Sequence, residues 1–268
     1  MRENAYAKIN LALHVRGRMA DGYHRIETAF AFAKDGDVLE AAEGEGLTLA
    51  ITGPFAAGLS TGEDNLVLRA ARALSERAGI ARGARLTLDK RLPVAAGIGG
   101  GSADAAAALR LLHRFWGVNA GEAALLDIAR GLGADVPACL VSRPTRGEGK
   151  GDELRPLDDP ELAGTPVLLA NPGVPLPTAQ VFQSWGGEDD GPLGDWRDGR
   201  NDLEAPASRI VPDIAEILGA LRGARFARMS GSGATCFGLY DDRAKRDAAA
   251  GAIAAAHPGW WMLATRLR

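Results

Sequence analysis

A glycine-rich stretch ahead of an Ala/Leu-rich run is the part of the sequence best suited to bind a ligand. Gly97, Gly99, Gly100 and Gly101 precede Ser102, and the apolar residues that follow recur at spacings of three and four, as in a helix. Glycines allow positive φ angles and a close approach of the backbone to a ligand. A helix N-terminus carries unpaired N–H groups and the positive end of the helix dipole, so the segment predicts a phosphate-binding loop. We expect Ser102 to be the N-cap of the helix.

The pattern differs from the two best-known phosphate motifs. No Gly-Lys-Ser/Thr follows the glycines, which excludes a Walker loop, and Ser102 stands where the dinucleotide fingerprint has its third glycine. A tight turn that binds no ligand is the alternative for this segment taken alone.

Three further segments carry side chains that phosphoryl transfer could use. Lys8 and Asn10 share one face of a predicted strand, Asp135 stands between a glycine and Val-Pro, and residues 228–235 form a Ser/Gly-rich loop. Phosphoryl transfer requires a cradle for the phosphates, a cation that stabilises developing charge, and an acceptor for the proton of the attacking hydroxyl. Plainer roles are a solvated strand face for Lys8 and Asn10, and a turn or cap for Asp135.

The elements that position these residues follow from hydrophobic periodicity and turn signals. Asp64 or Asn65 is expected to cap a helix that ends at Gly79, and Gly36-Asp37 marks a turn. The other elements expected in this half are strands at residues 4–15, 24–33, 38–40, 47–52, 84–89 and 138–141, and helices from 102 onward and at 122–131.

The polar, Gly/Pro-rich residues 142–157 predict a boundary between two domains, residues 1–150 and 151–268. Beyond it we expect strands at residues 166–170, 236–240 and 260–265, a helix capped by Thr178, and a helix at 243–256. Another helix carries the apolar residues Ile214, Ile217, Leu218 and Leu221. The acidic residues 184–200 are expected to form a mobile surface loop. The pattern is that of an α+β protein.

Composition excludes several classes of function. A net charge of −3 over 268 residues gives no electrostatic support for binding nucleic acid or an anionic membrane. No apolar run approaches the ~20 residues of a membrane span, and the N-terminus lacks a signal-type apolar block, so we expect a cytoplasmic protein. The two cysteines, Cys139 and Cys236, are expected to be buried, reduced thiols.

Read together, the segments resemble the GHMP kinase superfamily. Seven segments match in the family's order: residues 7–11, 21–24, 92–106, 133–137, 172–173 with Thr178, 201–204 and 229–234. The resemblance implies an N-terminal domain like domain 2 of ribosomal protein S5 and a ferredoxin-like C-terminal domain. It also implies an ATP-dependent kinase, and the most similar branch phosphorylates a cytidine-diphosphate-linked methylerythritol in the non-mevalonate route to isoprenoids.

The resemblance further implies roles for individual residues. Asp135 matches the base that accepts the proton of the substrate hydroxyl, and Lys8 matches the lysine that pairs with it. Ser102 matches a residue that faces the phosphates or Mg²⁺. The positions that match the phosphate loop of ATP are Val94, Ala95, Ala96, Gly97, Ile98, Gly99, Gly100, Gly101, Ser102, Ala103 and Asp104. Those that match the surroundings of the nucleotide base are Asn65, Leu66 and Lys90.

On the substrate side, Tyr23 matches a residue that stacks on cytosine and His24 one that hydrogen-bonds to its edge. The other matching positions are Asn10, Thr178, Gly231, Ser232 and Gly233. A monomer or homodimer that acts on a small molecule is expected. Ala95 and Ala96 replace glycines that are common in the family, so we expect ordinary φ angles there.

Three alternatives remain at this point. Another kinase of the superfamily, acting on mevalonate or homoserine, would have no nucleobase to place on Tyr23. A nucleotide-binding regulator without catalysis would not need Lys8 and Asp135 together. A nucleic-acid binder on an S5-like fold is disfavoured by the acidic composition.

Overall fold

The computed structural model describes residues 1–221 and 223–268, which form two compact units. The first unit contains Met1–Ala7, Asp35–Val94 and Gly99–Ser142. The second contains Lys8–Lys34, Ala95–Ile98 and Arg143–Arg268. Strands β1 (Arg2–Arg18) and β2 (His24–Ala42) pair with each other, and each contributes residues to both units. The division at residues 150 and 151 stays a prediction.

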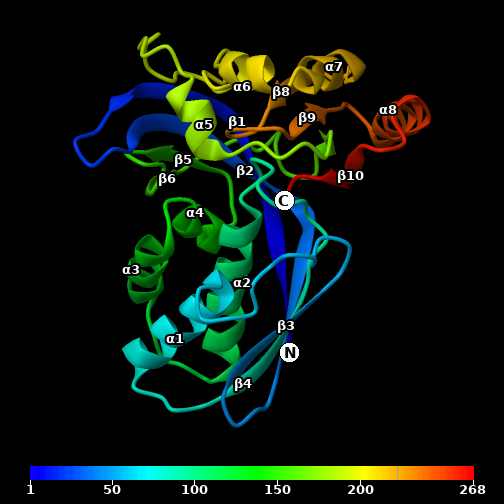
Figure 1. The fold of residues 1–268 in the computed structure, drawn as a ribbon. Coiled ribbons are helices and arrows are strands. Elements are labelled where there is room, and N and C mark those ends of the chain that lie inside the picture. Colours follow the sequence, from blue (N-terminus) through cyan, green and yellow to red (C-terminus); the bar gives the residue numbers. More distant parts are fainter. Residues whose placement is uncertain (222) are drawn as a thin grey trace. The chain divides into compact units, whose positions relative to one another are not determined.

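The first unit contains a β–α–β segment followed by three helices (Figure 1). Its elements are β3 (Leu47–Thr52), α1 (Leu66–Ala78), β4 (Ala84–Asp89), α2 (Gly100–Phe115), α3 (Glu122–Leu132) and α4 (Val136–Val141). β3 pairs parallel with β4, and β4 pairs antiparallel with the Val38–Ala42 end of β2. α2 is buried along its Ala/Leu face and packs against α1 and α4.

The predicted turn at Gly36-Asp37 is wrong, because β2 runs through it without interruption. A Cβ atom at Gly36 would lie 1.9 Å from the carbonyl oxygen of Ala5, so glycine is what lets β2 pass this close to β1. Asp37 is thereby carried into the interior of the first unit, where its side chain is fully buried.

The predicted N-cap of α1 is confirmed, whereas that of α2 is wrong. Asn65 caps α1, since its side chain accepts a hydrogen bond from the Val67 N–H at 2.9 Å, and Gly79 ends α1 in the left-handed conformation, as predicted. Ser102 is not the N-cap of α2. The cap is Gly99, with φ of 63°, and Ser102 is the third residue of the helix. Glycine replaces serine at the cap because the chain enters the helix with a positive φ.

The predicted strand at residues 138–141 is also wrong, because Val136–Val141 forms the short helix α4. Four apolar residues have no periodicity that separates a buried strand from a buried helix turn. Pro137 fits the first turn of a helix, where its missing N–H needs no partner.

The second unit contains an antiparallel sheet in the order β10-β7-β9-β8, which is the order of a ferredoxin-like domain with connections β–α–β–β–α–β. The strands of this sheet are β7 (Pro166–Asn171), β8 (Phe226–Met229), β9 (Cys236–Leu239) and β10 (Trp261–Arg266). The unit also contains β5 (Thr145–Glu148) and β6 (Glu153–Pro156). Its helices are α5 (Thr178–Gln183), α6 (Glu204–Ile210), α7 (Asp213–Ala220) and α8 (Arg243–Ala256). β5 and β6 form a hairpin that pairs with residues Thr28–Phe30 of β2.

Two details differ from the sequence-based expectations for this unit. α6 precedes α7 and is separated from it by Val211, which takes an extended conformation because Pro212 follows. The cap of α5 is Pro177 rather than Thr178, which is the first residue of the helix.

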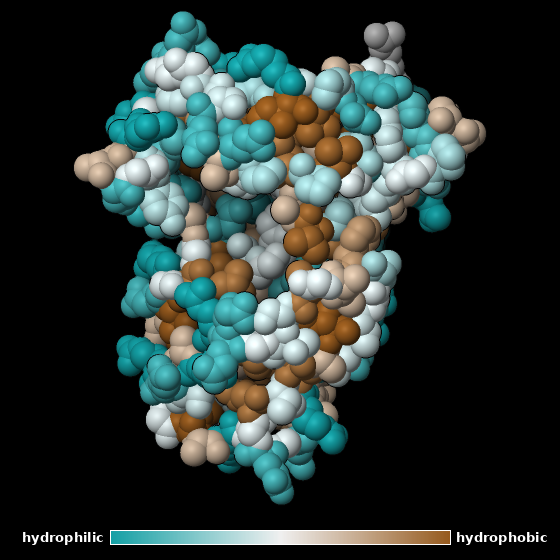
Figure 2. Space-filling view, in the orientation of Figure 1, coloured by the Kyte–Doolittle hydropathy of each residue, from teal (hydrophilic) through white to brown (hydrophobic). Residues whose placement is uncertain are grey.

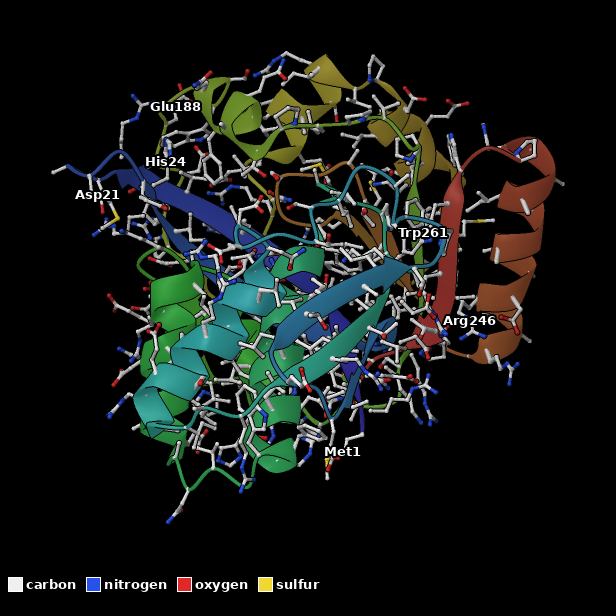
Figure 3. All side chains as sticks on the ribbon, turned by 60° about the horizontal axis from the view of Figure 1, so that its bottom comes forward. Met1, Asp21, His24, Glu188, Arg246 and Trp261 are labelled. Atoms are coloured by element: carbon white, nitrogen blue, oxygen red, sulfur yellow. The ribbon has the colours of Figure 1, made fainter. Side chains whose placement is uncertain are left out.

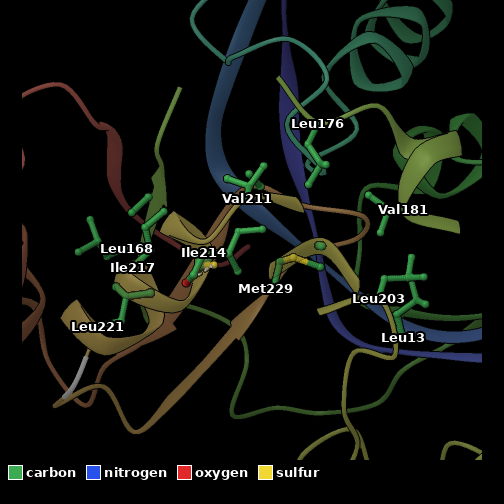
Figure 4. Packing of buried hydrophobic residues seen from close by; sticks show 14 of the residues in the cluster. Leu13, Leu168, Leu176, Val181, Leu203, Val211, Ile214, Ile217, Leu221 and Met229 are labelled. Carbon is green, nitrogen blue, oxygen red and sulfur yellow. Dashed lines mark hydrogen bonds between the residues drawn. The ribbon is translucent and has the colours of Figure 1, made fainter. Parts of the chain in front are cut away.

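The core of the second unit joins β1, the sheet and helices α5 to α8 (Figure 4). Leu13 of β1 belongs to the same buried cluster as Leu168 of β7, Ile214 of α7 and Met229 of β8. Each buried aliphatic side chain contributes about 1.5–3 kcal/mol through the removal of apolar surface from water. The face drawn in Figure 2 is mostly hydrophilic, with separate hydrophobic patches.

Residues 184–200 are not a plain surface loop. Leu193 and Trp196 are buried, the Trp196 indole N–H donates to Asp159 at 2.8 Å, and the backbone N–H of Leu193 donates to Glu27 at 2.7 Å. The expectation of a mobile loop rested on acidic and glycine content, but the buried Leu193 and Trp196 pack the segment against other residues of the second unit.

Candidate active site

In the first unit, the glycine-rich segment ends at the N-terminus of α2. The first intrahelical hydrogen bond runs from the Ala103 N–H to the Gly99 carbonyl at 2.8 Å. The N–H groups of Gly100, Gly101 and Ser102 therefore precede the hydrogen-bonded part of the helix and can point at an anion. Ser102 is half-buried, and Gly101 is exposed. The geometry fits the cradle for phosphates that the sequence predicts.

A buried ionic cluster lies directly beneath this N-terminus. The Lys90 ammonium contacts a carboxylate oxygen of Asp37 at 2.5 Å and one of Asp104 at 2.6 Å. The other oxygen of Asp37 accepts hydrogen bonds from the backbone N–H groups of Arg91, at 2.5 Å, and Leu92, at 2.8 Å. Lys90 and Asp104 were predicted to lie near a nucleotide. The structure directs both charged groups into the protein, where they pair with each other.

The cluster holds two carboxylates and one ammonium. Burial and this excess of carboxylates shift the pKa values of Asp104 and Lys90. Burial disfavours the carboxylate of Asp104 and, together with the negative charge of Asp37, outweighs the attraction of Lys90, which raises the pKa of Asp104 to about 7. Burial also opposes the charge on Lys90, but the two carboxylates outweigh that effect and raise the pKa of Lys90. Asp37 was missed as a functional residue because a Gly-Asp pair is a common turn signal.

Asn65 and Leu66, predicted to lie near the nucleotide base, are at the start of α1. Besides capping α1, Asn65 donates from its side-chain amide to the Ser60 carbonyl at 2.7 Å. A Cβ atom built at Gly101 would lie 3.7 Å from a methyl group of Leu66, so the structure brings Leu66 next to the first turn of α2.

Asp135 occupies the N-cap position of α4 and is half-buried. Its side chain makes no capping hydrogen bond to the helix, and its backbone is in the right-handed helical region. The Asp135 carboxylate therefore does not cap the helix.

In the second unit, Lys8 begins a chain of buried polar side chains. Its ammonium donates to the Asn10 side-chain oxygen at 2.7 Å, and the Asn10 amide donates to the Thr28 hydroxyl at 2.8 Å. Lys8 and Asn10 are both almost fully buried, at 3% and 2% exposure, so they do not form a solvated strand face. The ammonium also lies 4.9 Å from the centre of the Phe30 ring. These contacts hold the Lys8 side chain in one position.

The central residues of the glycine-rich segment, Ala95–Ile98, are tied to the Ser/Gly-rich loop at residues 230–235. The Ser230 hydroxyl donates to the Gly97 carbonyl and accepts from the Asn10 N–H, both at 3.0 Å. The expectation for Ala95 is wrong, since its φ is 52°. A short side chain tolerates this left-handed conformation at the cost of some strain, and Ala is the smallest after glycine.

Asn201 and Glu204, whose segment was recognised without a role, hold the Ser/Gly-rich loop. The Asn201 amide donates to the carbonyls of Met229 and Gly231, each at 2.8 Å, and the Glu204 carboxylate accepts from the Met229 N–H at 3.0 Å. Two predicted substrate-side residues also meet here, because the hydroxyls of Thr178 and Ser232 are 2.9 Å apart.

The predicted base-recognition residues lie at the turn between β1 and β2. Tyr23 is 55% exposed, while His24 stacks on Phe182 at 4.7 Å between ring centres and meets Trp185 edge-on at 5.7 Å. Among the residues that the structure describes, the Nε2 atom of His24 is buried without a hydrogen-bond partner. Phe182 and Trp185 were missed because their helix and the following residues are distant in sequence from His24.

Comparison with known proteins places these features in a family. Two family models match: the GHMP kinases N-terminal domain at residues 65–143 and the GHMP kinases C-terminal domain at residues 188–259. A 4-diphosphocytidyl-2-C-methyl-D-erythritol kinase from Rhizorhabdus wittichii is 54% identical over 99% of this chain and 94% of its own length. The chain belongs to the 4-diphosphocytidyl-2-C-methyl-D-erythritol kinase family of GHMP kinases.

Solved structures agree with this membership of the kinase family. A crystal structure of 4-(cytidine 5′-diphospho)-2C-methyl-D-erythritol kinase has a TM-score of 0.85 and 36% identity, and covers 100% of this chain and 99% of that one. A homoserine kinase from Cytophaga hutchinsonii shares the fold, with a TM-score of 0.72 and 16% identity over 98% of this chain and 95% of its own. The predicted two-domain GHMP kinase fold is confirmed.

The described residues of the kinase form neither a membrane span nor a metal cluster. No helix at residues 1–221 or 223–268 is long and apolar enough to cross a membrane. No three His, Cys, Asp or Glu side chains of these residues gather in a way that could hold a metal ion. Both cysteines are buried thiols rather than half-cystines, as predicted.

Proposed function

We propose that this kinase transfers the γ-phosphoryl group of ATP to the 2-hydroxyl of 4-diphosphocytidyl-2-C-methyl-D-erythritol, giving the 2-phosphate and ADP. The reaction belongs to the non-mevalonate pathway of isoprenoid biosynthesis. The observation that carries the choice of substrate is the aromatic site around His24, because mevalonate and homoserine carry no nucleobase for such a site to bind.

The His24 site has the properties that recognition of cytosine requires. Burial, and secondarily the positive charge of Arg18, lowers the pKa of His24, so the imidazole is neutral at pH 7. A neutral imidazole has one nitrogen that donates and one that accepts. The partnerless Nε2 of His24 would gain a hydrogen bond from the edge of the base, and the exposed ring of Tyr23 offers a stacking surface.

For the chemical step, we assign the two roles that phosphoryl transfer needs to Asp135 and Lys8. Asp135 would accept the proton of the attacking hydroxyl, and Lys8, held by Asn10 at 2.7 Å, would stabilise negative charge on the transferred group. Lys8 belongs to the second unit and Asp135 to the first. The pairing of these two side chains is therefore part of the proposal.

ATP use follows from membership of the kinase family, and we assign its phosphates to the N-terminus of α2. Mg²⁺ would neutralise charge on these phosphates when it is bound with the nucleotide, and the Ser102 hydroxyl is our candidate ligand. The residues present fit such an ion, because Mg²⁺ in kinases is held mainly by phosphate oxygens and water, with few protein ligands. Cytoplasmic location and a monomeric or dimeric state are included in the proposal.

A direct test is release of ADP and identification of the phosphorylated product by mass and ³¹P NMR. The chain should phosphorylate the cytidine substrate and leave mevalonate and homoserine unchanged. Turnover of either alternative alcohol at a comparable kcat/KM would reject the proposed substrate. Nucleotide binding without ADP release above background would instead favour a regulator without catalysis.

A further inference from the structure

The exposed Tyr23 ring is held by an ion pair that the proposed function does not use. The Lys150 ammonium lies 4.1 Å from the centre of the Tyr23 ring and contacts the Asp21 carboxylate at 2.6 Å. The other Asp21 oxygen accepts a hydrogen bond from the Tyr23 backbone N–H at 3.1 Å. Asp21 therefore fixes both the backbone of Tyr23 and the cation on its ring. Figure 3 shows Asp21 and His24 at the same end of β1 and β2.

Lys150 is delivered to this position by the turn of the β5–β6 hairpin, which is anchored to β2. The Ile26 N–H donates to the Gly149 carbonyl at 2.8 Å, and the Lys150 N–H donates to Asp152 at 3.2 Å. A Cβ atom at Gly151 would lie 3.3 Å from the Ile26 side chain, so the turn packs closely on β2. The backbone at Lys150 is thus fixed beside Ile26, which lies two residues after His24 in β2.

Both members of the ion pair stay charged at neutral pH. The hydrogen bond with Asp21 raises the pKa of Lys150, and the hydrogen bond with Lys150, helped by the Tyr23 N–H, lowers the pKa of Asp21. The ammonium is attracted to the negative face of the aromatic ring, so it restrains rotation of an otherwise exposed side chain.

We propose that Lys150 is a positioning residue for the nucleobase: its ammonium covers one face of the Tyr23 ring, so that the cytosine base stacks on the opposite face. This inference rests on the proposed function. An exposed tyrosine with both faces open would lose more conformational freedom when a base stacks on it. Lys150 restrains the Tyr23 ring before the substrate arrives, so part of this conformational freedom is already lost in the free enzyme. It also leaves only one face of the ring open to the base.

The test is the Lys150→Met variant, which keeps the length of the side chain and removes its charge. A surface cation–π contact corresponds to about a 2- to 5-fold change in affinity. We expect KM for the cytidine substrate to rise by that factor, with kcat and KM for ATP unchanged. Lys150→Arg should restore most of the affinity, because a guanidinium also stacks on aromatic faces. Lys245→Met is the matched control, since Lys245 of α8 forms a similar 2.7 Å surface ion pair with Asp241.

A double-mutant cycle separates this role from a direct contact between Lys150 and the diphosphate of the substrate. In a Tyr23→Leu background, Lys150→Met should have no further effect on KM. The proposal is overturned if the loss persists undiminished in that background, or if Lys150→Met matches Lys245→Met.

Binding of cytidine 5′-diphosphate by calorimetry gives the same comparison without turnover. An enzyme that binds this nucleotide through Tyr23 and Lys150 but does not phosphorylate the substrate would reject the proposed function alone. An enzyme in which neither residue affects nucleotide binding would reject the role of Lys150.

Discussion

Lys90 and Asp104 form a 2.6 Å ion pair that joins the two ends of the glycine-rich segment. Lys90 precedes that segment and Asp104 lies in the helix that follows it, so their contact closes the loop between them. Asp37 adds a third attachment through the backbone N–H groups of Arg91 and Leu92. The glycine-rich turn thus rests on a buried cluster of charges rather than on apolar packing alone.

The first prediction follows from the surplus carboxylate of this cluster. The pKa of Asp104 is raised to about 7 from an ordinary value of 3.8, so the folded chain holds this proton more tightly than the unfolded chain. The stability that Asp104 contributes is therefore fully present below pH 3.8 and is lost as pH rises through about 7. Asp104→Asn cannot titrate, so the difference in Tm between parent and variant should fall as pH rises from 4 to 8. Thermal unfolding across that range measures it, and a constant difference would contradict the assignment.

The second prediction concerns catalysis. Asp135→Asn should lower kcat by about 10²–10⁴ with much smaller changes in affinity, because general base catalysis acts mainly in the transition state. Lys8→Met should also lower kcat, and the double variant should be little worse than the poorer single variant. Asp127→Asn is the control, since Asp127 is a 69% exposed carboxylate on α3 that pairs with Arg130. A kcat for Asp135→Asn within a few-fold of the parent would show that Asp135 is only a turn residue.

The third prediction compares two glycines of the glycine-rich segment. Gly97 has φ of 74°, and a Cβ atom there would lie 2.4 Å from the Ser230 carbonyl oxygen. Gly97→Ala should therefore lower the free energy of unfolding by at least about 1–2 kcal/mol. At Gly101 the nearest atom to a Cβ is a Leu66 methyl at 3.7 Å, so Gly101→Ala should raise stability by up to about 1 kcal/mol. Denaturant unfolding checks both. A stable Gly101→Ala variant that binds ATP weakly would identify the Gly101 backbone as a phosphate contact.

The fourth prediction tests the support of the Ser/Gly-rich loop. Asn201→Ala leaves the buried carbonyls of Met229 and Gly231 without their 2.8 Å hydrogen bonds. The expected loss is on the order of 2–4 kcal/mol in the free energy of unfolding. Asn119, which is exposed, provides the control, because Asn119→Ala should change stability by less than about 0.5 kcal/mol. Equal effects of the two substitutions would mean that Asn201 does not hold the loop.

Local rules predicted the elements in which one signal dominates. The N-cap Asn65 and the C-cap Gly79 were enough to predict where α1 begins and ends. The predicted bounds of the helix at residues 243–256 match those of α8. Strand periodicity located the core of β1 but not its length, because pairing with β2 extends it at both ends.

The errors occurred where distant contacts override local preference. Gly36-Asp37 resembles a turn, yet β2 continues through it, where Ala5 approaches Gly36 closely and Asp37 pairs with Lys90. Ala95 takes a positive φ within a segment whose neighbours are bonded to the loop at residues 230–235. The sequence identifies candidate residues for a kinase site, whereas the charge cluster and the Lys150 contact depend on partners that no local pattern reveals.

The division of β1 and β2 between the two compact units has a consequence for synthesis on the ribosome. The second unit needs both Lys8–Lys34 and Arg143–Arg268, and most of the first unit, Asp35–Val94 and Gly99–Ser142, is synthesised between them. Leu267 bridges to Ala33, and the Arg268 N–H donates to the Phe32 carbonyl at 3.0 Å. The parts of β1 and β2 that pack into the second unit therefore lack these partners until Arg143–Arg268 has been synthesised, and their apolar side chains stay exposed during that interval.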